Sequence, residues 1–285
     1  MLSRKLIVMV TSCVVFVSLV ALSVTVTQSE EGPSASISAE KPQATSLFTG
    51  SQSSQRIVDV ETTLASFQSS DPKIRRQAAS DDAKLGPAAK KAIPALIVML
   101  AEEDESVQEA AATALAKMGS NAKEALPQLI TVLGSGPPVR SAAIAAITAI
   151  GPEAKSAAPA LGKLLKNTND DVALQAAVAL HALAEQEQAC RTELIRLLES
   201  KEPYVRTGAA RELGTYRQLA KESVPALLSV LKDQTARGYV REAAVQALGE
   251  INPGDPEVKD ALVTALNDKR RSVQEAAKAA LKKIR

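Results

Sequence analysis

The strongest constraint on the fold of this chain is an internal repeat of about 33 residues. A β-branched marker residue recurs at Ile74, Val107, Val139, Val172, Val205, Val240 and Val273. Four positions after each marker lies an alanine, at Ala78, Ala111, Ala143, Ala176, Ala209, Ala244 and Ala277. Apolar residues also recur 8 and 11 positions after most markers. Positions 0, 4, 8 and 11 share one side of an α-helix, so each copy contains a helix with a single apolar stripe.

A second helix precedes each marker helix. Prolines suited to a first helical turn recur upstream of the markers, at Pro94, Pro127, Pro159 and Pro225. Helix-start signals such as Asp71-Pro72 and Glu202-Pro203 lie between the two helices. Glycines fall at or near the end of the marker helix and are expected to cap it, at Gly86, Gly119, Gly151, Gly214 and Gly249. Each copy is therefore a helical hairpin.

Such a hairpin cannot bury its apolar faces alone, whereas stacked copies form a continuous core. The sequence predicts an all-α fold, a right-handed α-solenoid of about seven hairpins over residues 57–285. At the ends of a solenoid polar residues can replace core residues, as Asp81 and Asp82 do in the first copy and Lys278 does in the last. The motifs SVQEAA at 106–111 and YVREAA at 239–244 resemble HEAT repeats, particularly the short kind shared with phycobilin lyases. That resemblance implies the fold and says little about function.

The first 26 residues predict a membrane segment. Arg4 and Lys5 precede an apolar run from Leu6 to Val26, long enough to span a bilayer as a helix. Basic residues before the run place the N-terminus in the cytoplasm, so we expect a signal anchor with the repeats on the extracytoplasmic side. A cleaved signal peptide is the alternative, with small residues around Ala21, and the protein would then be exported. A third possibility is a lipoprotein that carries its lipid on Cys13. Residues 27–56 are polar, and we expect a flexible linker there.

Charge and composition exclude several classes of function. The chain has 34 basic and 32 acidic residues, of which four and three lie in residues 1–56, so 30 and 29 remain in the repeats. Nucleic acid is not expected as a partner, because a phosphate-binding surface needs a basic excess. Only 2% of the residues are aromatic, and small aliphatic side chains suit thin helical layers better than a deep pocket. We therefore expect no small-molecule substrate.

Catalysis lacks residues to carry it. His181 is the single histidine, and the His-Glu pairs that hold iron in deoxyhypusine hydroxylases, a HEAT-type family, are absent. We expect His181 to face solvent. Cys190 takes a position where other copies have alanine, which predicts a buried thiol and not a nucleophile. The prediction is a non-enzyme without metal or cofactor.

Arginines follow four of the seven markers directly, at Arg75, Arg140, Arg206 and Arg241. They could form an anion-binding row. Because arginine at this position of HEAT repeats commonly pairs with acids in the turns, the resemblance favours a ladder between repeats, with Asp71 and Glu202 as nearby acids. Gln108, Ala173 and Gln274 interrupt the row.

A helical wheel suggests where a partner binds. Positions 2, 6 and 9 after the marker point away from the core stripe. They are mostly polar, but in the fourth copy they are Leu174, Val178 and His181, with Ala145 and Arg211 on the adjacent copies. This predicts an exposed apolar patch suited to protein binding. The alternative is a shifted wheel, with Leu174 and Val178 in the core.

The leading functional hypothesis is a monomeric scaffold or adaptor, held at the membrane, that binds a protein partner along an exposed helical face. Two alternatives stay open. One is a phycobilin lyase or isomerase, by resemblance to short HEAT repeats, and the other is a regulatory or assembly subunit of an envelope complex.

Overall fold

The structure, a computed structural model, describes residues 60–252 and 254–283, and in that part of the chain it contains helices and no strands. The helices that open the hairpins are α1 (Val60–Ser66), α3 (Ile93–Leu100), α5 (Leu126–Thr131), α7 (Ala158–Leu164), α9 (Glu187–Leu197), α11 (Val224–Lys232) and α13 (Pro256–Ala265). The marker helices are α2 (Pro72–Leu85), α4 (Glu105–Met118), α6 (Pro137–Ile150), α8 (Asp170–Ala182), α10 (Pro203–Thr215), α12 (Gly238–Ile251) and α14 (Arg271–Lys283).

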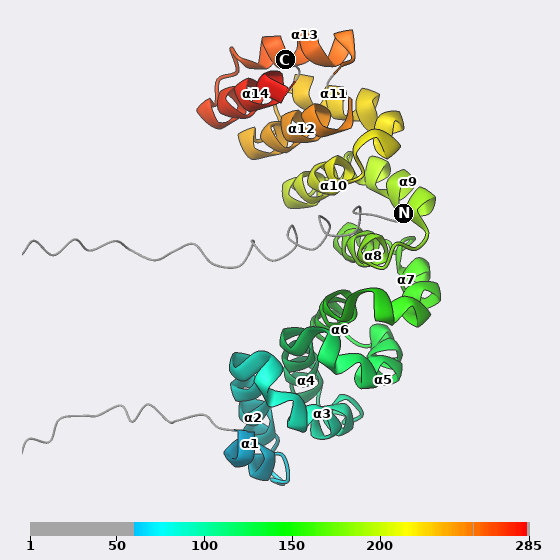
Figure 1. Cartoon of the computed structure of the whole chain (residues 1–285), viewed down its shortest axis with the longest axis vertical. Coiled ribbons are helices and arrows are strands. Elements are labelled where there is room, and N and C mark those ends of the chain that lie inside the picture. Colours follow the sequence, from blue (N-terminus) through cyan, green and yellow to red (C-terminus); the bar gives the residue numbers. More distant parts are fainter. Residues whose placement is uncertain (1–59, 253, 284–285) are drawn as a thin grey trace, which may run out of the picture. The chain divides into compact units, whose positions relative to one another are not determined.

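These elements form seven stacked hairpins within the described residues, α1 with α2 through α13 with α14 (Figure 1). Each marker helix contacts the marker helices before and after it, so α2, α4, α6, α8, α10, α12 and α14 make one layer. Short 3-10 segments connect several hairpins: η1 (Gly86–Ala92), η2 (Gly119–Ala125), η4 (Gly151–Ala157) and η5 (Arg217–Ser223). A further one, η3 (Val132–Gly134), lies inside the third hairpin between α5 and α6. The predicted α-solenoid is confirmed.

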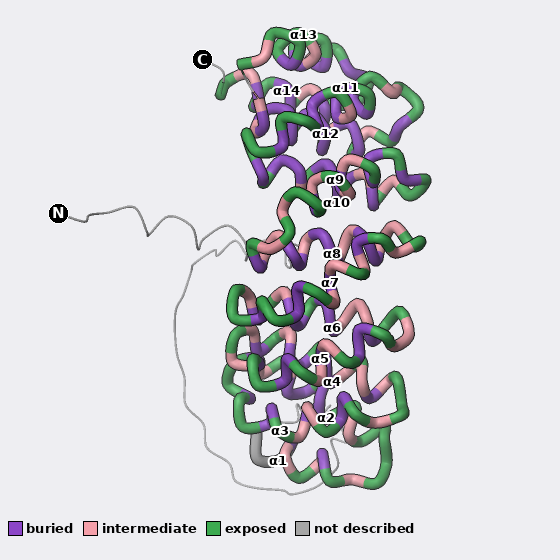
Figure 2. The backbone as a smooth tube through the Cα atoms, turned by 90° about the vertical axis from the view of Figure 1, so that its right-hand side faces the viewer, coloured by how far each residue is buried: buried purple, intermediate pink, exposed green. Residues whose placement is uncertain are grey.

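The repeated apolar stripe forms the core. The markers from Val107 onward are buried, as are all seven alanines four positions later. Ile74, the first marker, is 46% exposed, because no earlier marker helix covers it. Figure 2 shows that buried residues recur in every marker helix from α2 to α14. Alanine at position 4 lets adjacent marker helices approach closely, so the repeat pattern sets the spacing of the stack.

The expected glycine caps divide into two groups. Gly86, Gly119 and Gly151 follow the ends of α2, α4 and α6 with φ of 57°, 59° and 76°, as predicted for C-terminal caps. Gly214 and Gly249 are not caps, because they lie inside α10 and α12. A Cβ added at Gly249 would lie 2.7 Å from the Ala280 Cβ, so this glycine permits close contact between α12 and α14.

In the fourth and fifth repeats other residues hold the cap position. Ala184 lies 33 residues after Gly151, and Arg217 lies 33 residues after Ala184. Their φ angles are 54° and 51°. A side chain in this left-handed region costs free energy that glycine avoids. The connection after α8 is more strained still, because Gln186 also has a positive φ of 51°.

The two ends of the stack differ. Lys278 on α14 is exposed, as expected of a terminal repeat, and its Nζ lies 3.1 Å from Glu275 Oε1. At the other end Asp81 and Asp82, which replace apolar residues of the other repeats, are nevertheless buried. The Thr63 hydroxyl of α1 donates to Asp82 Oδ1 at 2.7 Å, and burial raises the pKa of the Asp82 carboxyl. Helix α1 therefore covers the first marker helix.

None of the helices in residues 60–252 and 254–283 has the length and apolarity to cross a membrane. The predicted signal anchor at 1–26 and linker at 27–56 lie outside the described residues, and both stay predictions.

Candidate functional site

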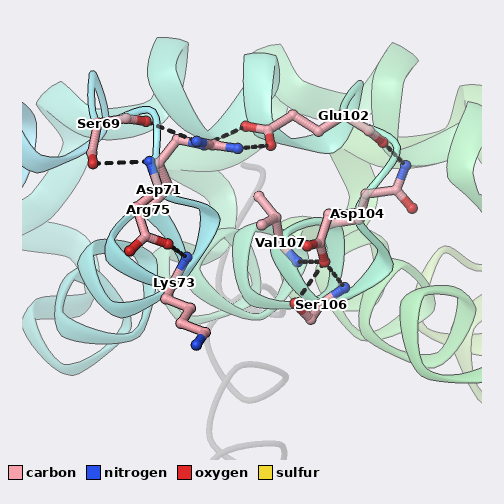
Figure 3. Close-up of polar contacts among 9 residues, drawn as sticks. Ser69, Asp71, Lys73, Arg75, Glu102, Asp104, Ser106 and Val107 are labelled. Atoms are coloured by element: carbon pink, nitrogen blue, oxygen red, sulfur yellow. Dashed lines mark hydrogen bonds and ion pairs between the residues drawn. The ribbon is translucent and has the colours of Figure 1, made fainter.

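Two arginines of the interrupted row, Arg75 and Arg241, join successive repeats. Arg75 Nη1 donates to the Ser69 carbonyl at 2.7 Å, and Arg75 Nε donates to Glu102 Oε1 at 2.9 Å (Figure 3). Glu102 lies 27 residues later, in the turn of the next hairpin. At Arg75 the interpretation as a contact between repeats is therefore correct, but the paired acid is Glu102 and not the neighbouring Asp71.

The sixth repeat contains the same arrangement in a more buried form. Arg241 Nε and Nη2 donate to the two Asp268 carboxylate oxygens, each at 2.8 Å, and Nη1 donates to the Ala236 carbonyl. Asp268 again lies 27 residues after its arginine. The side chains of Arg241 and Asp268 are 4% and 3% exposed. One side chain thus closes its own turn and joins it to the next repeat.

In three other repeats the ladder residue binds only the turn of its own repeat. Gln108 Nε2 donates to the Glu102 carbonyl at 2.6 Å, and Gln274 Nε2 donates to the Asp268 carbonyl at 2.7 Å. Arg140 donates to the carbonyls of Leu133 and Ser135 at 2.9 and 2.7 Å. The glutamines that seemed to break the row therefore still bind a turn.

In the fourth repeat the ladder residue makes neither the contact to its own turn nor the contact to the next repeat. Its residue at the ladder position is Ala173, which has no donor to offer to the turn or to the next repeat. Arg206 in the fifth repeat has a buried Nε without a hydrogen bond among the described residues, but it still carries the guanidinium. Ala173 is the one ladder residue, of the seven described, that lacks a side-chain donor.

A cleft of about 460 Å³ lies in the same part of the stack. It lies between the turn that precedes α8 and the turn that precedes α10. Its lining includes Thr168, Asp170 and Asp171 from the first turn and Ser200, Glu202 and Tyr204 from the second. Ser200 is 27 residues after Ala173, so it holds the position that Glu102 and Asp268 hold in their repeats. The cleft is the turn end of a seam between α8 and α10.

More acidic than basic side chains line the cleft. Arg196 on its wall is already bound, because its Nη2 lies 2.8 Å from Asp170 Oδ1 and 2.6 Å from Glu193 Oε1. The Ser200 hydroxyl and then Arg196 lower the pKa of Asp170. Tyr204 is 54% exposed. Its pKa is raised by partial burial and then by the charges of Asp171, Glu202 and Asp170, so the ring lies in a negative field.

The predicted patch occupies the middle of the same seam. Leu174 and Val178 on α8 are half-buried, between the two alternatives that the helical wheel left open. Leu174 leans over Gly208 of α10, where an added Cβ would lie 2.5 Å from Leu174 Cδ2. Arg211 on α10 and Ala145 on α6 are exposed.

The far end of the seam is a polar cluster that the sequence did not predict. His181 does not face solvent, because it is half-buried with its ring centroid 4.0 Å from that of Tyr216 at an interplanar angle of 68°. The Arg191 guanidinium lies 5.6 Å from the Tyr216 ring centroid. Burial raises the pKa of the nearby Cys190 thiol to about 11 and that of the Glu212 carboxyl to about 7. The thiol is therefore neutral at physiological pH, as expected of a structural cysteine.

Comparison with protein families identifies the repeat. A family model described as HEAT repeats matches residues 60–148 and 191–282. Together the two matches cover more than half of the chain, and the interval between them contains α7 and α8. No curated protein sequence matches the chain.

Several solved structures have a similar fold. The YibA protein of Escherichia coli is 23% identical with a TM-score of 0.56, over 79% of this chain and 80% of that chain. A chain of the CpcE and CpcF complex of phycocyanin lyase from Nostoc sp. PCC7120 is 25% identical with a TM-score of 0.52, over 83% and 92%. A chain of the Kap95 and Nup1 complex is 12% identical with a TM-score of 0.56, over 79% and 35%.

Proposed function

Since this chain belongs to the HEAT-repeat family, we propose that it is a non-catalytic scaffold that holds a protein partner along the seam between α8 and α10. One observation carries the proposal. At this seam the described residues form a cleft and leave the apolar side chains of Leu174 and Val178 half-buried. A solenoid exposes extended faces for binding, and an irregular repeat distinguishes one part of such a face from the rest.

The seam combines the parts that a protein interface needs. Leu174 and Val178 offer a half-buried apolar centre, and burial of such a centre by a partner supplies most of the binding energy. Exposed polar groups flank it, with Arg211 on one side and Tyr204 at the turn end. Apolar centres with polar rims are typical of protein interfaces.

Two features of the chain support a role without catalysis. The thiol of Cys190 is buried and un-ionised at neutral pH, so it is not an activated nucleophile. His181 is the single histidine of the sequence, and its ring is packed against Tyr216. A histidine held in this way is poorly placed as a general base for a substrate.

The proposed setting is the extracytoplasmic side of a membrane, with the repeats tethered by the N-terminal segment. Its support is the apolar run from Leu6 to Val26 behind a basic pair, together with the polar stretch that follows. If the segment is cleaved, the same scaffold is exported.

Charge substitution in the seam tests the scaffold. The variant Leu174→Glu with Val178→Glu should abolish capture of the partner, after the partner has been identified by affinity purification of the tethered protein. Val98→Glu is the matched control, because Val98 is 67% exposed on α3, away from the seam. The control should capture the partner normally. Equal capture by all three proteins refutes the proposed surface, and a collapse of the melting temperature in the double variant assigns both side chains to the core.

A second candidate, phycobilin lyase or isomerase activity, has one specific observation in its favour. The chain of the phycocyanin lyase complex resembles this one over most of both lengths. Incubation with a bilin and an apo-phycobiliprotein tests it, since attachment changes the absorption spectrum of the acceptor. An unchanged spectrum removes this candidate. Partner identification also tests the third possibility, a subunit of an envelope complex.

A further inference from the structure

We propose that the seam between α8 and α10 is a proton-controlled hinge, closed while Glu212 carries a proton and opened when its carboxylate turns to water. Glu212 lies on α10 and acts electrostatically on Cys190 and Tyr216, in the polar cluster at the far end of the seam. The hinge is a property of the chain without a partner, so it goes beyond the proposed scaffold and does not depend on it.

Glu212 occupies a core position of the repeat. It lies seven residues after its marker, Val205. In five other repeats this position is a buried alanine, at Ala114, Ala146, Ala179, Ala247 and Ala280. A carboxyl group inside the stack therefore takes a place that the fold otherwise fills with a methyl group.

The Glu212 carboxyl has no partner that would stabilise its charge. It is half-buried and makes no hydrogen bond or ion pair among the described residues, whereas Asp81, at the same position of the first repeat, binds Gln77 and Lys84. Burial is the cause that raises the pKa of Glu212 to about 7. An ionised carboxylate in such a place has lost hydration and gained no counterion, so ionisation favours any movement that returns it to water.

The titratable groups nearest to Glu212 stay neutral near pH 7. On α8 the His181 Nδ1 is buried without a hydrogen bond, and burial lowers the pKa of this ring. On α9 burial raises the pKa of the Cys190 thiol to about 11. On α10 burial also raises the pKa of the Tyr216 hydroxyl. Glu212 is therefore the member of this cluster that changes charge around neutral pH.

The charged groups around α10 do not neutralise Glu212. Arg191 of α9 donates to Glu222 of η5 at 2.9 Å, and Glu187 of α9 acts on the His181 ring. From α12 the residue at the same repeat position is the neutral Ala247, and Glu250 is paired with Lys283. The remaining nearby cations of α10 and η5 are exposed: Arg211, Arg217 and Lys221. None of these charges shifts the pKa of Glu212, which burial alone raises.

The seam is a place where the stack can open. Of the neighbouring marker helices, α8 and α10 pack least closely. Leu174 of α8 lies over Gly208 of α10, one helical turn before Glu212, and a Cβ added at Gly208 would lie 2.5 Å from Leu174 Cδ2. A flexible side chain on a glycine is easily lifted, because no side chain of the glycine interlocks with it. Opening exposes Leu174, so the proton on Glu212 sets the shape of the surface in the proposed scaffold.

Hydrogen exchange of the full chain at pH 6 and pH 8 tests the hinge, with Glu212→Gln measured beside it. The glutamine keeps the shape of the protonated side chain and cannot ionise. For a carboxyl pKa of about 7 closed and 4.5 open, the exchange rate of α8 and α10 relative to the variant should be about tenfold higher at pH 8 than at pH 6. The comparison with the variant at each pH cancels the opposite contribution of His181, whose pKa is lowered in the fold. The ratio for α4 should stay constant.

Glu250→Gln is the matched control, because it removes a paired carboxylate from α12, one repeat further on. It should show the same pH dependence as the unsubstituted chain. A carboxyl titration by NMR should in addition place Glu212 near pH 7. A ratio that does not change between pH 6 and pH 8, an equal change in every helix, or a titration of Glu212 near pH 4.5 overturns the hinge. These measurements use no partner, so their failure leaves the scaffold intact, and normal capture by the Leu174 and Val178 double variant refutes the scaffold surface alone.

Discussion

Removal of the Arg241 side chain tests how much the ladder contributes to the stability of the stack. In the native protein the guanidinium satisfies Asp268 with two hydrogen bonds of 2.8 Å, and both side chains are nearly inaccessible to water. Arg241→Ala leaves a buried carboxylate without a counterion. It also removes the donor to the Ala236 carbonyl. The variant therefore loses contacts within one repeat and between two.

The expected cost follows from this burial. Breaking a buried ion pair by removing one partner destabilises a protein by about 3 to 5 kcal/mol. The variant that removes both partners, Arg241→Ala with Asp268→Ala, should be less destabilised than Arg241→Ala, because no buried charge is left unpaired. Arg75→Ala is the matched control. The side chains of Arg75 and Glu102 are 17% and 23% exposed, so water can reach the abandoned Glu102, and the loss should be clearly smaller.

Urea unfolding of the full chain, followed by circular dichroism, measures these differences. The Arg241 guanidinium is the first cause that lowers the pKa of Asp268 in the fold, so this carboxyl contributes stability at neutral pH. That contribution is lost as the pH falls below about 4, the ordinary range of the group, toward its lower folded pKa. Arg241→Ala should lack this acid-dependent loss. Equal costs for Arg241→Ala and Arg75→Ala, or a double variant less stable than Arg241→Ala, would refute the reasoning.

Three further predictions concern packing, pH and backbone. Ala209→Leu should lower the unfolding free energy by about 1 to 3 kcal/mol, because Ala209 is fully buried, whereas the exposed Lys278→Ala should be nearly neutral; denaturant titration compares them. Glu212→Gln should remove a fall in melting temperature between pH 4.5 and about 7, since burial raises the pKa of Glu212 and ionisation disfavours the fold; parallel pH profiles would count against it. Ala184→Gly should raise stability by up to about 1 kcal/mol by relieving a φ of 54°, as measured by thermal unfolding, and a loss would contradict the cap assignment.

The fold could be predicted because its main determinant is repeated seven times. The marker and the alanine four positions later specify a buried stripe in each copy, so an error in one copy is corrected by the others. Gly214 and Gly249 show the limit of this pattern, because glycine is compatible both with a helix end and with close helix packing. Contacts with the next marker helix distinguish the two roles, because Gly214 lies against Ala247 and Gly249 lies against Ala280.

Partners across repeats were harder to predict than positions within one. The sequence indicated that Arg75 forms a ladder, but Asp71 is nearer along the chain than Glu102, and only stacking brings Glu102 into reach. Asp82 is a similar case, because its burial depends on Thr63 of α1, a helix with no marker of its own. The wheel placed Leu174 and Val178 on the exposed face because it assumes uniform stacking, and the α8 to α10 seam is where the stacking changes.

A partner bound at one seam can have a local effect because of the way a solenoid is stabilised. The stability of a repeat protein is approximately a sum of terms for each repeat and for each contact between neighbours. The seam between the fourth and fifth repeats therefore contributes its own term, separate from the contacts that Arg75 and Arg241 make elsewhere. A partner that binds only the folded seam stabilises that contact by mass action. A partner bound along Leu174 and Val178 should thus protect the backbone amides of α8 and α10 from hydrogen exchange more than those of α2 or α14. Uniform protection along the stack would show that binding does not act through the seam.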